Sequence, residues 1–199
     1  MVRKNFNILL AGVGGQGIIF AGQIIMESAL RQKKKVYGFE MHGMARRGGA
    51  VATHIRFGEE IYSPLIPAGS GNLLAAFEPS EALRHIHLMS PEALVILNTH
   101  PVIPIGISSK KGSYPDTNMI IDVIKKRCKN VHSFDATQMA KEAKDIISLN
   151  AIMLGAICAD DSAPLSSEVV REVLEQKSPS YIQKINLAAF DLGYEELKK

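Results

Sequence analysis

The chain has 199 residues, of which 46% are hydrophobic and 22% charged, and its formal net charge is +3. This is an ordinary globular composition, and we expect one domain over residues 1–199 with a substantial buried core. The charge is small and dispersed, tryptophan is absent and aromatic residues are few, so the composition argues against a nucleic-acid partner.

The chain is predicted to begin with a strand, a glycine-rich turn and a helix. An apolar run at residues 7–11 leads into Gly12-Val13-Gly14-Gly15-Gln16-Gly17, and a helix from Ile18 to about Gln32 follows. The turn fits the G-x-G-x-x-G pattern, in which backbone N–H groups and the positive end of a helix dipole bind a pyrophosphate. The alternative is a turn that only packs helix against sheet. The candidate binding residues here are Gly12, Gly14, Gly15, Gln16 and Gly17.

A second strand is predicted at residues 36–40, and a polar, glycine-rich loop follows it. Glu40 is placed roughly where NAD-binding domains carry an acidic residue for the ribose. The loop adds His42, Arg46 and Arg47, an unusual density of positive charge for a plain NAD site. The two arginines suit a phosphate or a carboxylate. The alternatives are an ion pair with Glu40, or arginines that face solvent or a partner.

A third predicted strand, residues 50–57, alternates as a strand with one exposed face would. Gly58 and Glu59 can turn it into residues 60–63, which predicts a hairpin after the second strand. Further strands are predicted at residues 72–77, 93–98 and 131–134. Helices are predicted at residues 79–86 with Ser80 as N-cap, at 117–126 and at 136–143, and residues 99–115 are predicted to form a long, functional loop.

The last third of the chain is predicted to be helical. Residues 150–159 are apolar on most sides and indicate a buried helix. Ser166 or Ser167 can cap a helix over residues 169–176, and a last helix is predicted to run from Pro179 toward Gly193. The predicted fold is therefore α/β and Rossmann-like, with a mostly parallel sheet flanked by helices, a hairpin after the second strand and a helical C-terminal part.

The sequence shows neither a metal motif nor a nucleophile motif. Cys128 and Cys158 have no C-x-x-C spacing and are too few to hold an iron–sulfur cluster or a structural zinc alone. The six histidines are scattered, and no G-x-S-x-G elbow is present. Reduced thiols are the simplest account of the cysteines. The N-terminal apolar run is too short, and too broken by glycines, to be a signal peptide or a membrane span. Together with reduced cysteines, this predicts a cytoplasmic protein without a membrane partner.

Three segments together resemble a known family. They are the turn at residues 12–17, the block E-M-H-G-M-A-R-R-G-G at residues 40–49, and S-P-L-I-P at residues 63–67. In order and spacing they resemble the gamma subunit or domain of the 2-oxoacid:ferredoxin oxidoreductases. The likeness is nearest to the beta subunit of indolepyruvate ferredoxin oxidoreductase, where this domain is a separate chain. It covers the whole chain, although Arg46 replaces the glutamine of the family pattern.

The resemblance implies a non-redox subunit that is inactive alone and carries no cofactor itself. A large partner subunit would hold thiamine diphosphate and iron–sulfur clusters. It would convert a 2-oxoacid such as indolepyruvate, coenzyme A (CoA) and oxidised ferredoxin into an acyl-CoA, carbon dioxide and reduced ferredoxin. The glycine turn, with Glu40, His42, Arg46 and Arg47, would then bind the phosphates of CoA or the carboxylate of the substrate.

Two other hypotheses stay open on the sequence. One is a stand-alone nucleotide- or NAD(P)-binding Rossmann protein, which would bind a dinucleotide without a partner. The other is a purely structural interface subunit in which the glycine turn binds nothing.

Overall fold

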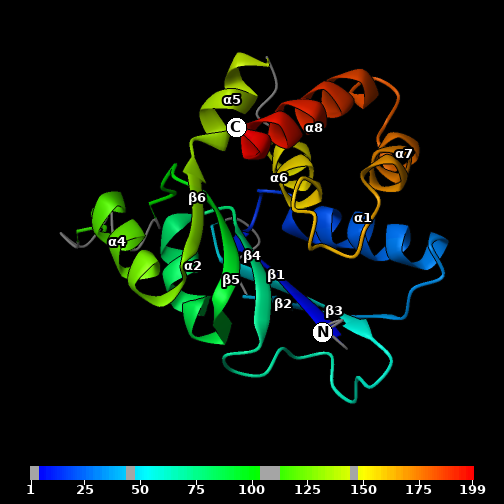
Figure 1. Ribbon diagram of the computed structural model, residues 1–199. Coiled ribbons are helices and arrows are strands. Elements are labelled where there is room, and N and C mark those ends of the chain that lie inside the picture. Colours follow the sequence, from blue (N-terminus) through cyan, green and yellow to red (C-terminus); the bar gives the residue numbers. More distant parts are fainter. Residues whose placement is uncertain (1–4, 44–47, 104–112, 144–147) are drawn as a thin grey trace.

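The computed structural model describes residues 5–43, 48–103, 113–143 and 148–199, which form a six-stranded sheet with helices on both faces (Figure 1). The strands are β1 (Asn5–Val13), β2 (Val36–His42), β3 (Ala50–Gly58), β4 (Gly71–Ala76), β5 (Met89–Asn98) and β6 (Asn130–Phe134). The helices are α1 (Ile18–Arg31), α2 (Pro79–His85), α4 (Thr117–Arg127), α5 (Ala136–Glu142), α6 (Leu149–Cys158), α7 (Ser167–Lys177) and α8 (Gln183–Lys198), with a short 3₁₀ turn at Ile86–Leu88.

The strand order is β2-β3-β1-β4-β5-β6. Strands β1, β4, β5 and β6 are parallel, whereas β3 runs antiparallel to both of its neighbours, β1 and β2. This confirms the predicted α/β fold with a mostly parallel sheet. It also places the carboxyl ends of the four parallel strands along one edge, where ligands of open α/β sheets bind.

The antiparallel hairpin is made of β2 and β3, and the strand expected at residues 60–63 is absent. Strand β3 lies between β1 and β2, so both of its hydrogen-bonding edges are already occupied. Residues 60–63 therefore cannot pair with β3, and they continue into the connection to β4.

The expectation of an exposed face on β3 was wrong, because both of its faces are buried. One face packs in the core beneath α1. The other carries His54 and Arg56, which the segment at residues 63–66 covers. Arg56 donates to the carbonyls of Ser63 (2.6 Å) and Leu65 (3.0 Å), and the Ile66 N–H donates to His54 Nδ1 (3.2 Å). The polar side chains of this strand thus bind a loop. Their alternation with apolar residues therefore looks, in the sequence, like that of a strand with one exposed face.

Two helix starts differ from the predictions. The N-cap of α2 is Glu78, not Ser80: its buried carboxylate accepts the Glu81 N–H at 3.0 Å, and Pro79 fills the first helical position. The last helix begins at Gln183 and continues past Gly193 to Lys198. Ser166 caps α7 as predicted, accepting the Val169 N–H at 3.4 Å.

Helices α1, α6, α7 and α8 cover one face of the sheet, and α2 and α4 cover the other (Figure 1). All ten residues of α6 are buried, which confirms the predicted buried helix. Helices α6 and α8 cross at Gly155 and Gly193, where each glycine faces the backbone of the other helix. Any side chain at either position would occupy space that the partner backbone already fills.

One histidine makes the fold sensitive to acid. Burial lowers the pKa of His85 to about 4, helped by positive charge on His54, His87 and Arg84, although Glu81 Oε2 lies 3.8 Å from its Nε2. The unfolded chain binds this proton near pH 6.5. The free energy of unfolding should therefore decrease as the pH falls from about 6.5 to about 4. Urea unfolding at several pH values in this range measures this decrease. If a His85→Gln variant lost free energy of unfolding with falling pH as steeply as the wild type, the prediction would be contradicted.

Candidate functional site

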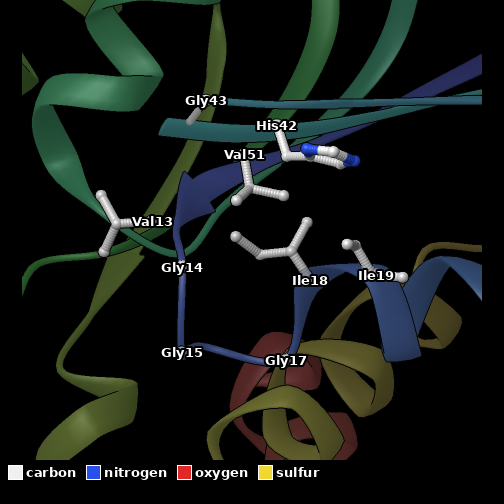
Figure 2. A pocket seen from close by; sticks show the side chains of 9 residues that line it. All are labelled: Val13, Gly14, Gly15, Gly17, Ile18, Ile19, His42, Gly43 and Val51. Carbon is white, nitrogen blue, oxygen red and sulfur yellow. The ribbon is translucent and has the colours of Figure 1, made fainter. Parts of the chain in front are cut away.

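The glycine turn joins the carboxyl end of β1 to the first turn of α1 (Figure 2). Gly15 and Gly17 have φ of +104° and +76°, a backbone conformation that residues other than glycine rarely adopt. Gly17 is the N-cap of α1 and offers no side-chain cap, and the first turn of α1 contains no acidic residue. The N–H groups and positive dipole end of α1 are thus available to an anion.

The Gln16 side chain folds back onto the turn. Its Oε1 accepts the Val13 N–H at 2.8 Å, and its Nε2 donates to the Phe77 carbonyl at 2.8 Å. Gly12 leaves the room for this amide, because a Cβ at that position would lie 2.6 Å from Gln16 Oε1 and 2.8 Å from Phe77 Cβ. The first glycine of the motif is therefore required by a side chain of the motif itself.

The last glycine of the motif packs against α6. A Cβ on Gly17 would overlap the Asn150 amide nitrogen and lie 3.0 Å from Asn150 Cγ. Asn150 is 8% exposed and belongs to the first turn of α6. The N-termini of α1 and α6 consequently meet at the turn.

The glycine turn and the loop after β2 are joined directly. The Gly14 N–H donates to the Gly49 carbonyl at 2.8 Å, and the Gly48 N–H donates to the Gly14 carbonyl at 3.2 Å. Since Gly48 immediately follows the two arginines in the sequence, these bonds bring together the two candidate segments that the sequence singled out separately.

A cavity of about 550 Å³ opens between the turn, the start of α1 and the β2–β3 hairpin (Figure 2). The His42 imidazole lies on one side of it, opposite Ile18 and Ile19 of α1. The cavity thus combines an anion-attracting helix start with apolar walls. Its described lining consists of Val13, Gly14, Gly15, Gly17, Ile18, Ile19, His42, Gly43 and Val51.

Four of the predicted binding residues line this cavity: Gly14, Gly15, Gly17 and His42. Gly12 and Gln16 shape the turn but are not part of the lining. Glu40 is on β2, outside the lining as well. Arg46 and Arg47 lie outside the described residues. The binding roles of these residues stay predictions.

Sequence reasoning missed the apolar part of the site. The sequence places Ile18 and Ile19 only in a predicted helix and Val51 only in a predicted strand, whereas the structure shows that all three also line the cavity. A helix that begins with two large apolar residues directly after a glycine turn was the available signal. Asn150 carried no such signal, because its contact with Gly17 is formed only by the tertiary fold.

The cysteines take no part in this site. Both are buried free thiols, and they lie in the two separate hydrophobic clusters on opposite faces of the sheet. Burial raises the pKa of Cys158 far above its usual range, which makes its thiol a poor nucleophile or ligand. In the described parts of the chain, no helix is long and apolar enough to cross a membrane.

The comparisons with known proteins agree on one family. The model of the family described as pyruvate ferredoxin/flavodoxin oxidoreductase matches residues 7–196. The indolepyruvate oxidoreductase subunit IorB of Methanothermobacter thermautotrophicus is 42% identical over 190 residues, which are 96% of each chain.

Two solved structures have the same fold. The gamma subunit of a keto/oxoacid ferredoxin oxidoreductase from Geobacter sulfurreducens superposes with a TM-score of 0.69 at 20% identity, over 97% of this chain and 98% of that one. The second is a 2-oxoglutarate:ferredoxin oxidoreductase from Magnetococcus marinus with 2-oxoglutarate, coenzyme A and succinyl-CoA bound. It gives a TM-score of 0.72 at 24% identity over 98% of this chain, but only 31% of that longer chain.

Proposed function

Because the chain belongs to the pyruvate ferredoxin/flavodoxin oxidoreductase family, we propose that it is the small subunit of an indolepyruvate-type 2-oxoacid:ferredoxin oxidoreductase. The full-length match to IorB, at 42% identity, is the observation that supports this assignment most strongly. The substrate is then an arylpyruvate, and the products are an acyl-CoA, carbon dioxide and reduced ferredoxin. We expect the enzyme in the cytoplasm.

A larger partner subunit supplies the redox chemistry in this proposal. Thiamine diphosphate supports decarboxylation, and iron–sulfur clusters pass electrons to ferredoxin. The residues of this chain do not fit a cluster, because Cys128 and Cys158 are buried on opposite faces of the sheet. Supplying a binding surface for the co-substrate is the role that its geometry supports.

We further propose that the turn cavity binds CoA. The start of α1, free of acidic side chains, suits the diphosphate of CoA, while the apolar walls suit its pantetheine arm. His42 lines the same cavity, and we propose that it contacts the ligand. Gly48 and Gly49 are hydrogen-bonded to Gly14, one of the residues that line the cavity.

Purification of the tagged chain from its own source under anaerobic conditions tests the subunit assignment. Native mass spectrometry should find a larger partner that carries thiamine diphosphate and iron–sulfur clusters. The complex should reduce ferredoxin with indolepyruvate and CoA faster than with pyruvate. A homo-oligomer that retains a dinucleotide would instead support the stand-alone Rossmann hypothesis.

Hydrogen exchange in the purified complex tests the cavity. CoA should slow amide exchange in residues 13–19, and the same concentration of NAD should not, because the proposed site takes CoA specifically. Protection by NAD alone would contradict the CoA assignment. Exchange that neither molecule changes would leave the turn a purely structural element.

A further inference from the structure

We infer that Gln16 is a positioning residue for CoA: it holds the glycine turn in its binding geometry through the Phe77 carbonyl, and does not itself touch the ligand. This inference rests on the proposed binding of CoA at the turn. It assigns Gln16 a different role from that of the glycines beside it, although all belong to one motif.

Both ends of the Gln16 amide are hydrogen-bonded to the backbone. Its oxygen accepts the N–H of Val13, the last residue of β1, and its nitrogen donates to the Phe77 carbonyl directly after β4. One side chain thus joins the carboxyl ends of two neighbouring parallel strands. With both ends of the amide occupied in this way, and Gln16 outside the cavity lining, the amide is oriented toward the sheet.

The Phe77 carbonyl is itself fixed from a second side. Asn98, fully buried at the end of β5, donates to the same oxygen at 2.9 Å and to Thr137 Oγ1 of α5 at 2.9 Å. Both lone pairs of the Phe77 oxygen are therefore used by side-chain amides. Gln16 is therefore anchored to a carbonyl that the rest of the fold holds in place, because Phe77 follows β4 and its oxygen is bound by Asn98 of β5, which in turn is bound to Thr137 of α5.

The consequence for the ligand follows from the path of the chain. Val13 and Gln16 flank Gly14 and Gly15, and both of these glycines line the cavity. The two glycines have no side chains that could hold the turn in place. The backbone bonds between Gly14 and the Gly48–Gly49 segment remain without Gln16, but they do not reach Gly15 or the start of α1. We therefore expect loss of the Gln16 side-chain bonds to loosen this part of the turn and the arrangement of its N–H groups.

The test compares Gln16→Met, which keeps the length of the side chain but loses both hydrogen bonds, with Gln23→Ala. Gln23 is exposed on α1, outside the turn, and serves as the control. Both variants are purified in the complete complex. Amide exchange of residues 13–18 is measured without CoA, and KM and kcat are measured for CoA and for indolepyruvate. Gln16→Ala is the second variant if Gln16→Met does not assemble.

We expect Gln16→Met to speed exchange of the turn at least about fivefold and to raise KM for CoA about tenfold. The KM for indolepyruvate and kcat at saturating CoA should stay within about twofold of wild type, and Gln23→Ala should change nothing. A higher KM for CoA with unchanged exchange would overturn the inference, because Gln16 would then contact the ligand directly.

Faster exchange with an unchanged KM for CoA would also overturn it, because the shape of the turn would not matter to CoA. The protection experiment then separates the two proposals. If CoA still slows exchange of residues 13–19 in the wild-type complex, the CoA site stands and only the role of Gln16 is wrong. If it does not, the site itself is wrong.

Discussion

Replacing Gly155 with alanine should cost at least about 3 kcal/mol of the free energy of unfolding. The added Cβ would overlap the Phe190 carbonyl oxygen of α8 and lie 2.8 Å from the Tyr194 nitrogen. Both atoms are backbone, so α6 and α8 must move apart. Gly→Ala inside a helix otherwise gains about 1 kcal/mol, which is too little to offset this separation. Urea unfolding of the two proteins measures the difference.

Gly38→Ala is the matched control for Gly155→Ala. It adds the same methyl group, but the atoms that it meets are the thioether end of the Met26 side chain, which can rotate away. We expect a loss of less than about 1 kcal/mol there. If Gly155→Ala lost as little free energy of unfolding as this control, that result would contradict a close backbone contact between α6 and α8 at Gly155.

The largest effect on catalysis is expected for Ile19→Glu. Ile19 is the second residue of α1, and its side chain lines the cavity at the positive end of the helix. A carboxylate there is favourable for the helix dipole. It also places negative charge where the diphosphate of CoA is proposed to bind, and the repulsion should raise KM for CoA about a hundredfold.

Ile19→Gln is the control, because it loses the same apolar contacts without adding a charge. Steady-state kinetics of the two complexes at low and high salt should show a difference in KM for CoA that shrinks as salt rises. The KM for indolepyruvate should be the same in both. Equal KM values for CoA in the two variants would contradict an anion site at the start of α1.

The local part of the site could be predicted from the sequence. A strand, four glycines within six residues and an apolar helix start predict a glycine turn at a helix N-terminus, and the structure has this turn, with positive φ at Gly15 and Gly17. The sequence also identified the loop after β2. Its contact with the turn, through Gly48 and Gly49, could not be derived, because backbone hydrogen bonds leave no pattern in the side chains.

The part that could not be predicted depends on distant contacts. The hydrogen bond from Gln16 to the carbonyl of Phe77, 61 residues away, has no counterpart in the local sequence. His54 and Arg56 indicated an exposed face because the loop that covers them is recruited only in the folded chain. The antiparallel placement of β3 was missed for the same reason: strand order is a property of the whole sheet.

The anchoring of the turn limits what can be done with its sequence. A peptide of residues 5–32 would contain the complete strand, turn and helix, but neither the Phe77 carbonyl nor the Gly48–Gly49 segment that holds Gly14. Grafting residues 12–17 into another protein would transfer the glycines and Gln16, but not the distant backbone groups to which they are hydrogen-bonded. An engineer who wants this binding loop must therefore transplant the sheet with it.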